Sequence, residues 1–266
     1  GRGRRRVHGE GDEKMSEIMN ELDGIYAVWL REAKIYVREK ERLISSGFSP
    51  LLWIFGFGTG IGSSLGTVEG YPYQTFIYPG IVVMAVLFTS LFYGIYIIWD
   101  RKLDFLKEVL VAPVSRASVF AGKMLGGATD AMVQVIFLMI IGLFINIPLN
   151  PLIVIQAFLL LLLISIAMVS IGLVIGANLK SPEGFGLVIN FVMWPMFFFS
   201  NALFTLENLP AWLTAITFIN PLTYAVDAVR GVILGINHFP IYLDIAVMMI
   251  FSGIMMILGV LSFRRM

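Results

Sequence analysis

Six apolar runs, each about the length of a membrane-spanning helix, dominate this sequence. A helix needs about 20 mainly apolar residues to cross a bilayer. The runs that meet this requirement are 48–66, 76–99, 124–147, 152–177, 185–204 and 241–263. The composition agrees, because 58% of the residues are hydrophobic and only 14% are charged, against about a quarter in an ordinary soluble domain. We therefore predict an all-α, polytopic membrane protein with six transmembrane helices.

The residues before the first run predict an amphipathic helix. Over 17–45, apolar side chains recur at three- and four-residue steps, and charged side chains fill much of the remainder. Trp29, Tyr36 and the flanking Lys and Arg suit the headgroup level, so we place an interface helix, over 15–47, flat on the membrane. A helix packed on a soluble partner is the alternative. Residues 1–14 are expected to be a disordered arm or a cloning remnant, with Met15 as the native start.

The basic residues predict the orientation of the chain. If both termini are cytoplasmic, 18 of the 19 Lys and Arg residues lie on the inner side and only Arg230 lies outside. We expect a multi-pass protein of the plasma membrane. The chain has no cysteine and two distant histidines, which disfavours a metal centre. No basic face outside the N-terminal arm indicates a nucleic-acid partner.

A glycine-rich stretch, GFGTGIGSSLG, lies in the first run. Its spacing fits neither of the common phosphate-binding loops, and no lysine follows it. We interpret it as small residues that let helices approach closely in lipid.

The segment between the second and third runs, 101–114, predicts a short amphipathic helix at the inner surface. Leucines share one face and charged side chains share another, by their three- and four-residue spacing. Pro113 stops this helix, and Ser115 can cap the next one. The apolar face needs a surface to lie on and the charged face another to meet, which favours a cytoplasmic partner protein.

The stretch after the fifth run predicts two short helices. Pro210 can open the first, Asn220 with Pro221 can break it and cap the second, and Gly231 or Gly235 can end the second. Neither is long enough to cross the membrane. We expect a re-entrant hairpin on the outer side, with an ordinary external loop as the alternative.

Three separated stretches carry a family resemblance. They are DRKLDFLKEVLVAPVSRASVFAGK, SPEGFGLVINFVMWPMFFFSNALFTLENLPAW and NPLTYAVDAVRG. Together they resemble the membrane subunit of an ABC-2 type ABC transporter, closest to the daunorubicin-resistance and nodulation-factor export permeases. The likeness runs from about Leu22 to the C-terminus. It implies that 48–266 is the transmembrane domain, that 101–114 is a coupling helix seated in a cleft of an ATPase subunit, and that 206–236 holds the outer re-entrant helices.

The resemblance also implies roles for individual residues. Those expected to couple to the ATPase are Leu103, Phe105, Leu106, Lys107, Glu108, Leu110, Pro113 and Arg116. Those expected at the outer gate or on the re-entrant helices are Pro210, Trp212, Asn220, Pro221, Tyr224, Asp227 and Arg230. Asp227 and Arg230 could pair there, or form only a solvated surface pair. Where such permeases often carry Gly-Thr or Phe-Gly, this chain has Asp104 and Phe105.

The sequence carries no Walker lysine motif, so the energy for transport must come from another molecule. We expect a permease subunit, not itself an enzyme, of an ATP-driven exporter for an amphiphilic, drug-like or lipid-linked substrate. Two cytoplasmic ABC ATPase subunits would carry ATP and Mg²⁺, and a second copy of the permease would complete a homodimer, with no cofactor in this chain. The alternative is an ion-coupled secondary transporter that uses Asp130, which forms a candidate intramembrane polar site with Gln134. No catalytic constellation favours a membrane enzyme.

Overall fold

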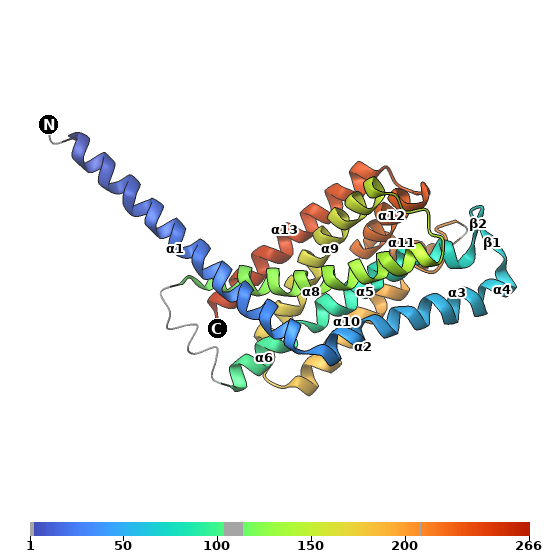
Figure 1. Cartoon of the computed structure of the whole chain (residues 1–266), viewed down its shortest axis with the longest axis horizontal. Helices are drawn as coiled ribbons and strands as arrows, with labels where there is room; N and C mark the ends of the chain where they lie inside the picture. Colours follow the sequence, from blue (N-terminus) through green and yellow to red (C-terminus); the bar gives the residue numbers. More distant parts are fainter. Residues whose placement is uncertain (1–2, 104–113, 208) are drawn as a thin grey trace.

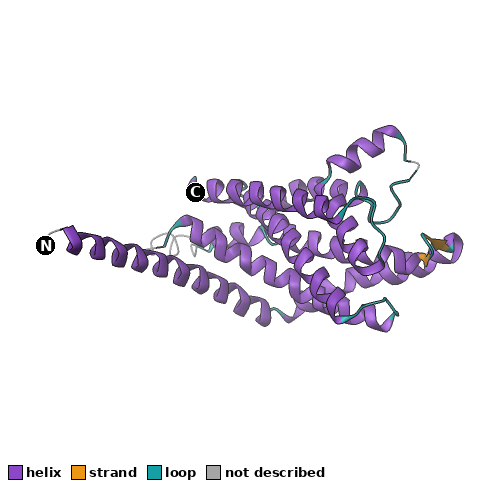
Figure 2. Cartoon of the chain, turned by 90° about the horizontal axis from the view of Figure 1, so that it is seen from above, coloured by secondary structure: helices purple, strands orange, loops and turns teal. Residues whose placement is uncertain are grey.

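The computed structural model describes residues 3–103, 114–207 and 209–266; the side chains of 3–15, 17, 42 and 43 lie outside the description. Long helices run side by side as a bundle, and the first helix leaves the bundle at one end (Figures 1 and 2). The N-terminal elements are α1 (Gly3–Arg38), α2 (Lys40–Leu52), a π-helical turn (Trp53–Phe57), α3 (Gly58–Gly60), α4 (Gly62–Leu65) and the antiparallel strands β1 (Thr67–Val68) and β2 (Tyr71–Pro72). The later helices are α5 (Tyr73–Phe92), α6 (Ile95–Lys102), α8 (Arg116–Phe144), α9 (Pro151–Asn178), α10 (Pro182–Phe198), α11 (Ala211–Ile219), α12 (Pro221–Leu234) and α13 (Ile241–Arg264).

Five helical segments of the described chain are long and apolar enough to cross a membrane. They are Ile44–Leu65, Tyr73–Lys102, Arg116–Phe144, Pro151–Asn178 and Ile241–Arg264. The all-α, polytopic fold is therefore confirmed in outline, and the number six stays a prediction. The predicted fifth span, 185–204, contains α10, which has 17 residues and a length of about 25 Å, shorter than the roughly 30 Å of a hydrocarbon core. It ends early because the chain turns at Ser200, whose backbone N–H and hydroxyl both bond to the carbonyl of Phe197.

The single amphipathic helix predicted over 17–45 is wrong in one respect. The helix breaks at Glu39, where the backbone angle ψ is 69°, so α1 ends at Arg38 and α2 begins at Lys40. The first candidate span then starts at Ile44, four residues before the predicted start at 48. As a result α1 is a separate helix that packs along α8, while α2 enters the bundle. Residues 3–14 are helical as the start of α1, in contrast to the disordered arm expected over 1–14; that 1–14 is a cloning remnant stays a prediction.

The centre of the bundle is formed by α5 and α9. Every residue from 76 to 87 on α5 is buried, as expected of a helix that is apolar on all faces. α9 packs against α5, α8, α12 and α13. Two of its glycines, Gly172 and Gly176, face Gly94 between α5 and α6 so closely that a β-carbon at any of the three would collide with backbone. Small residues spaced by four permit this close approach between helices in lipid.

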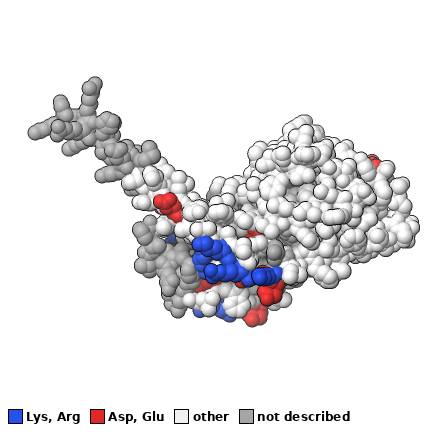
Figure 3. All heavy atoms as spheres, in the orientation of Figure 1, with Lys and Arg blue, Asp and Glu red and all other residues white. Residues whose placement is uncertain are grey.

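The two ends of the bundle separate the segments predicted to be inner from those predicted to be outer. The end of α6, the start of α8 and the C-terminus lie at one end, and the β1–β2 hairpin lies at the other (Figures 1 and 2). Lys and Arg side chains gather near the end where α1 leaves, whereas most of the remaining visible face is uncharged (Figure 3). This uneven distribution of Lys and Arg agrees with a bundle embedded in a membrane, in which basic residues gather on one side. Which end faces the cytoplasm stays a prediction.

Candidate functional site

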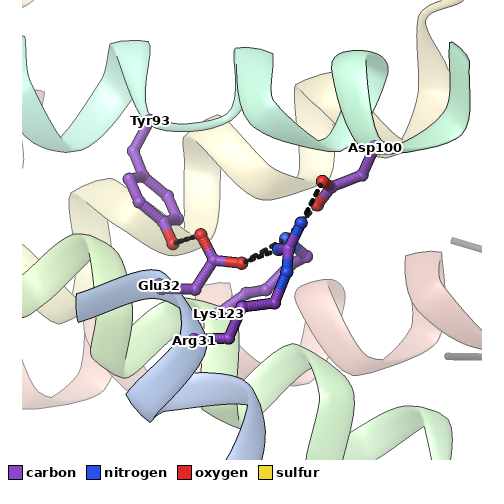
Figure 4. A network of polar contacts seen from close by, with 5 residues as sticks. All are labelled: Arg31, Glu32, Tyr93, Asp100 and Lys123. Atoms are coloured by element: carbon purple, nitrogen blue, oxygen red, sulfur yellow. Dashed lines mark hydrogen bonds and ion pairs between the residues drawn. The ribbon is translucent and has the colours of Figure 1, made fainter. Parts of the chain in front are cut away.

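A buried network of charged side chains joins three helices where α1 crosses the bundle (Figure 4). Arg31 and Glu32 come from α1, Asp100 from α6 and Lys123 from α8. Lys123 Nζ lies 3.0 Å from Glu32 Oε1 and also contacts Asp100 Oδ2. Arg31 lies 2.6 Å from Glu32 Oε1 and 3.1 Å from Asp100 Oδ1, and the Tyr93 hydroxyl donates to Glu32 Oε2 at 2.8 Å. Each carboxylate therefore meets two cations.

The network is deeply buried, with Lys123 only 1% exposed and Glu32 and Asp100 each 6% exposed. Charges this far from water are tolerated when they are paired and hydrogen-bonded, and the two cations and two anions balance. Burial alone would raise the pKa of Glu32, but the charge and hydrogen bond of Lys123, with help from Tyr93 and Arg31, hold that pKa below the ordinary 4.5. Glu32 is therefore ionised at neutral pH. The pairing holds α1 against both α6 and α8.

A second contact attaches α1 to the first turn of α8. Glu21 accepts hydrogen bonds from the backbone N–H of Ser115, at 3.2 Å, and from its hydroxyl, at 2.7 Å, as well as from the hydroxyl of Ser118. Ser115 also caps α8 by accepting from the N–H of Ser118. These hydrogen bonds, that of Ser118 foremost, lower the pKa of Glu21. The predicted capping role of Ser115 is confirmed.

Two arginines connect the end of α6 and the start of α8 to the C-terminal ends of α9 and α13. Arg101 donates to the carbonyl oxygens of Leu179 at 2.9 Å and Ala177 at 2.8 Å, at the end of α9. Arg116 donates to the carbonyl of Arg264 at 2.9 Å, at the end of α13. Cations at helix C-termini complement the partial negative charge there. The described residues that flank 104–113 are thus anchored on both sides of that segment.

Most of the predicted coupling residues lie within that segment. Phe105, Leu106, Lys107, Glu108, Leu110 and Pro113 lie outside the described residues. Leu103, just before them, is 75% exposed, and Arg116, just after them, makes the contact with α13 given above. The role of this set stays a prediction.

The predicted pair of short helices is confirmed as α11 and α12. Pro210 precedes α11, and Pro221 is the first residue of α12. Between them Asn220 accepts from the N–H of Leu222 and donates to the carbonyl of Met196. Gly235, in the left-handed conformation with φ 73°, ends α12.

The remaining predicted residues of this region divide between surface and interior. Trp212 is 62% exposed. Tyr224 is half-buried, and its hydroxyl donates to the carbonyl of Phe218 at 2.8 Å. Burial raises the pKa of Tyr224, with help from nearby Asp244, so this phenol stays protonated and able to donate.

Asp227 and Arg230 do not pair directly, in contrast to the sequence prediction. Both are buried, and no ion pair joins them in the described chain. Asp227 accepts instead from the backbone N–H groups of His238 and Phe239 at 2.8–3.0 Å. Arg230 donates to the carbonyls of Asn201 and Ala202 and lies 4.2 Å from the centre of the Phe76 ring. Each side chain therefore fastens a different loop to α12.

Asp130 and Gln134 lie one turn apart on α8 and are 1% and 3% exposed. The Gln134 amide donates to the carbonyl of Ser46 on α2, and its carbonyl accepts from the hydroxyl of Thr89 on α5. Gln134 therefore links three helices. A role of Asp130 in transport stays a prediction.

The network around Lys123 was not predicted from the sequence. One signal was present, because Asp100 and Lys123 stand at the edges of apolar runs and have opposite charges. Their partners are distant in sequence, however: Lys123 and Glu32 are separated by 91 positions. Only the packing of α1 across α6 and α8 brings these groups together.

Comparison of the sequence with known proteins finds a family and several relatives. The model of the family described as ABC-2 type transporter matches residues 23–234. A putative transport permease ycf38 of Cyanophora paradoxa is 36% identical over 230 residues, which cover 82% of this chain and 78% of the relative. The inner membrane transport permease YadH of Escherichia coli K12 is 28% identical over 232 residues, which cover 85% and 88%. Nodulation protein J of Rhizobium leguminosarum bv. viciae is 25% identical over 245 residues, which cover 90% and 93%. This chain belongs to the ABC-2 type transporter family, as a membrane subunit.

Proposed function

We propose that this chain is the permease subunit of an ATP-driven exporter. It moves an amphiphilic, drug-like or lipid-linked substrate out of the cytoplasm or the inner leaflet. Two cytoplasmic ABC ATPase subunits supply the energy, and ATP and Mg²⁺ bind to them. A second copy of the permease completes the transport path, and both termini face the cytoplasm.

The anchoring of the residues that flank 104–113 carries this proposal. On the leading side, Asp100 joins the buried network and Arg101 holds the end of α9. On the trailing side, Ser115 binds Glu21 of α1 and Lys123 joins the same network. Because the residues on either side of 104–113 contact α1, α6, α8 and α9, a partner protein that displaces this segment would also displace these helices. An ordinary connecting loop would not need buried charges at its base.

The test is to purify the permease together with the ABC ATPase encoded beside it and to measure substrate-stimulated ATP hydrolysis and efflux in vesicles. Leu106→Glu and Leu110→Glu should each abolish coupled hydrolysis while the permease remains folded. The matched control is Leu65→Glu, the same substitution at an exposed leucine on the opposite end of the bundle, which should leave coupling unchanged.

The result that overturns the proposal is efflux that continues after every ATPase partner is removed. If a proton gradient alone then drives efflux and Asp130→Asn eliminates it, the ion-coupled alternative replaces the proposal.

A further inference from the structure

A groove of about 570 Å³ lies between α2 and α8, within the roughly 300–1,000 Å³ typical of ligand pockets. Its lining is almost entirely apolar. The side chains that form most of its walls are Ile44, Phe48 and Leu51 from α2 and Val133, Ile136 and Phe137 from α8. Gly47 lets the Phe137 ring pack closely against α2, because a β-carbon there would come within 2.7 Å of that ring. A groove of this chemistry suits a hydrocarbon chain.

Two polar residues, Ser46 and Gln134, form one wall of this groove. The same two residues also line a second cavity, of about 280 Å³, between α2 and α5. Ser45, Ser49 and Thr89 add hydroxyl groups to the second cavity. The apolar groove and the more polar cavity therefore lie on either side of the hydrogen bond between Gln134 and the carbonyl of Ser46.

The residues that line the groove and the cavity favour an amphiphile whose head group is uncharged. The described residues that line the groove and the cavity include no Lys, Arg, Asp or Glu. A charged group placed there would lose its hydration without gaining a counter-charge, which is costly within a membrane. Hydroxyl and amide groups, in contrast, can exchange hydrogen bonds with a neutral polar head.

The depth of the polar wall also fits an amphiphile. Ser46 lies six residues after Lys40, the first residue of α2, or about 9 Å along the helix axis. The polar wall is therefore close to the charged end of the first candidate span. The apolar lining extends from there along α2 and α8, in the direction an acyl chain takes from its head.

We propose that the groove and the cavity together bind a single-chain amphiphile with an uncharged, hydrogen-bonding head. The chain lies in the groove between α2 and α8, and the head reaches Gln134, Ser49 and Thr89. This inference rests on the proposed function, because it names the class of substrate that the exporter takes. Binding itself needs no ATPase.

The test uses the full chain in phosphatidylcholine nanodiscs and two photoreactive probes. One is an alkyl glucoside and the other an alkyl sulfate of the same chain length, each with a diazirine at the chain end. Cross-linked residues are mapped by mass spectrometry. The glucoside should label the walls of the groove at least about tenfold more than the sulfate, the ratio that corresponds to about 1.4 kcal/mol.

Two tryptophan variants on one helix make a matched comparison. Ile136→Trp fills the groove from a position that is 50% exposed, and Leu143→Trp adds the same bulk at a lipid-facing position that is 57% exposed and outside the lining. Both positions are at the surface of α8, so neither change disturbs the core. Ile136→Trp should abolish labelling of the groove, and Leu143→Trp should leave it unchanged. Thr89→Val should reduce the preference for the glucoside.

The inference is overturned if the two probes label equally, if labels spread evenly over the lipid-facing residues, or if Ile136→Trp changes nothing. These outcomes are separate from the ATPase test. Labelling of the groove without ATP-driven efflux would contradict only the proposed function, and ATP-driven efflux with an unlabelled groove would contradict only this inference.

Discussion

Replacing Lys123 by methionine removes the central cation of the buried network and keeps most of the side-chain volume. Glu32 and Asp100 would both lose a partner, and both are 6% exposed, so neither can recover its hydration fully. Removing one member of a buried ion pair typically costs about 3–5 kcal/mol. Arg31 still contacts both carboxylates, at 2.6 and 3.1 Å, and its side chain is 31% exposed to water. We therefore expect the lower end of the range, about 3 kcal/mol.

Thermal unfolding of the purified chain in detergent measures this loss. For a chain of this size, about 3 kcal/mol corresponds to a decrease in Tm of roughly 6–12 °C. Lys34→Met is the matched control, because Lys34 is an exposed lysine on α1 whose loss should change the Tm little. The double variant Lys123→Met/Asp100→Asn should recover part of the loss, because it removes a carboxylate that the single variant leaves without its lysine. A Tm for Lys123→Met equal to that of Lys34→Met would show that the buried network contributes little to stability.

Three further predictions test other contacts. The pKa of Glu32 is held below 4.5 in the folded chain, so its contribution to stability is present above pH 4.5 and is lost as the pH falls below that value. The Tm of Glu32→Gln should therefore decline less over this acid range than the Tm of the unchanged protein. An identical decline in both would contradict the lowered pKa of Glu32. Gly94→Ala places a β-carbon against the backbone of α9 and should abolish the monodisperse peak in size-exclusion chromatography. The control Gly186→Ala, whose β-carbon meets no neighbour, should elute normally. Normal elution of both variants would show that the close approach of Gly94 to α9 is dispensable. Asp227→Asn weakens the acceptor of two backbone N–H groups before α13 and should lower the stability of this loop by about 1–3 kcal/mol. The loss should be measurable as faster hydrogen exchange of those two amides. Unchanged exchange would argue against this anchoring role of Asp227.

Local features of the fold could be predicted because short stretches of sequence determine them. The apolar runs that become α5, α8, α9 and α13 are visible in composition alone. The break between α11 and α12 follows from Asn220 and Pro221, since proline begins a helix well and asparagine caps it. The helix over 101–114 remains a prediction from the same kind of pattern.

Features that depend on distant contacts could not be predicted in this way. The break at Glu39 lies between Arg38 and Lys40, and all three residues favour helix, so no local signal marks it. The partners of Asp227 and Arg230 are backbone groups of two loops, not the charge three residues away that helical spacing suggests. In the sequence Lys123 is one of the basic residues that orient the chain, and its burial follows only from the contacts of α1 with α6 and α8.

We propose that the segment after Leu103 faces the cytoplasm and is contacted there by an ATPase subunit. The chain has no cysteine, so a single Leu103→Cys substitution, at a side chain that is 75% exposed, reports directly on this segment. A membrane-impermeant maleimide should label it only in inside-out vesicles, and the bound ATPase subunit should protect it, while Leu65→Cys at the other end of the bundle should be labelled only in intact cells. Labelling of Leu103→Cys from outside intact cells would contradict a cytoplasmic position of this segment.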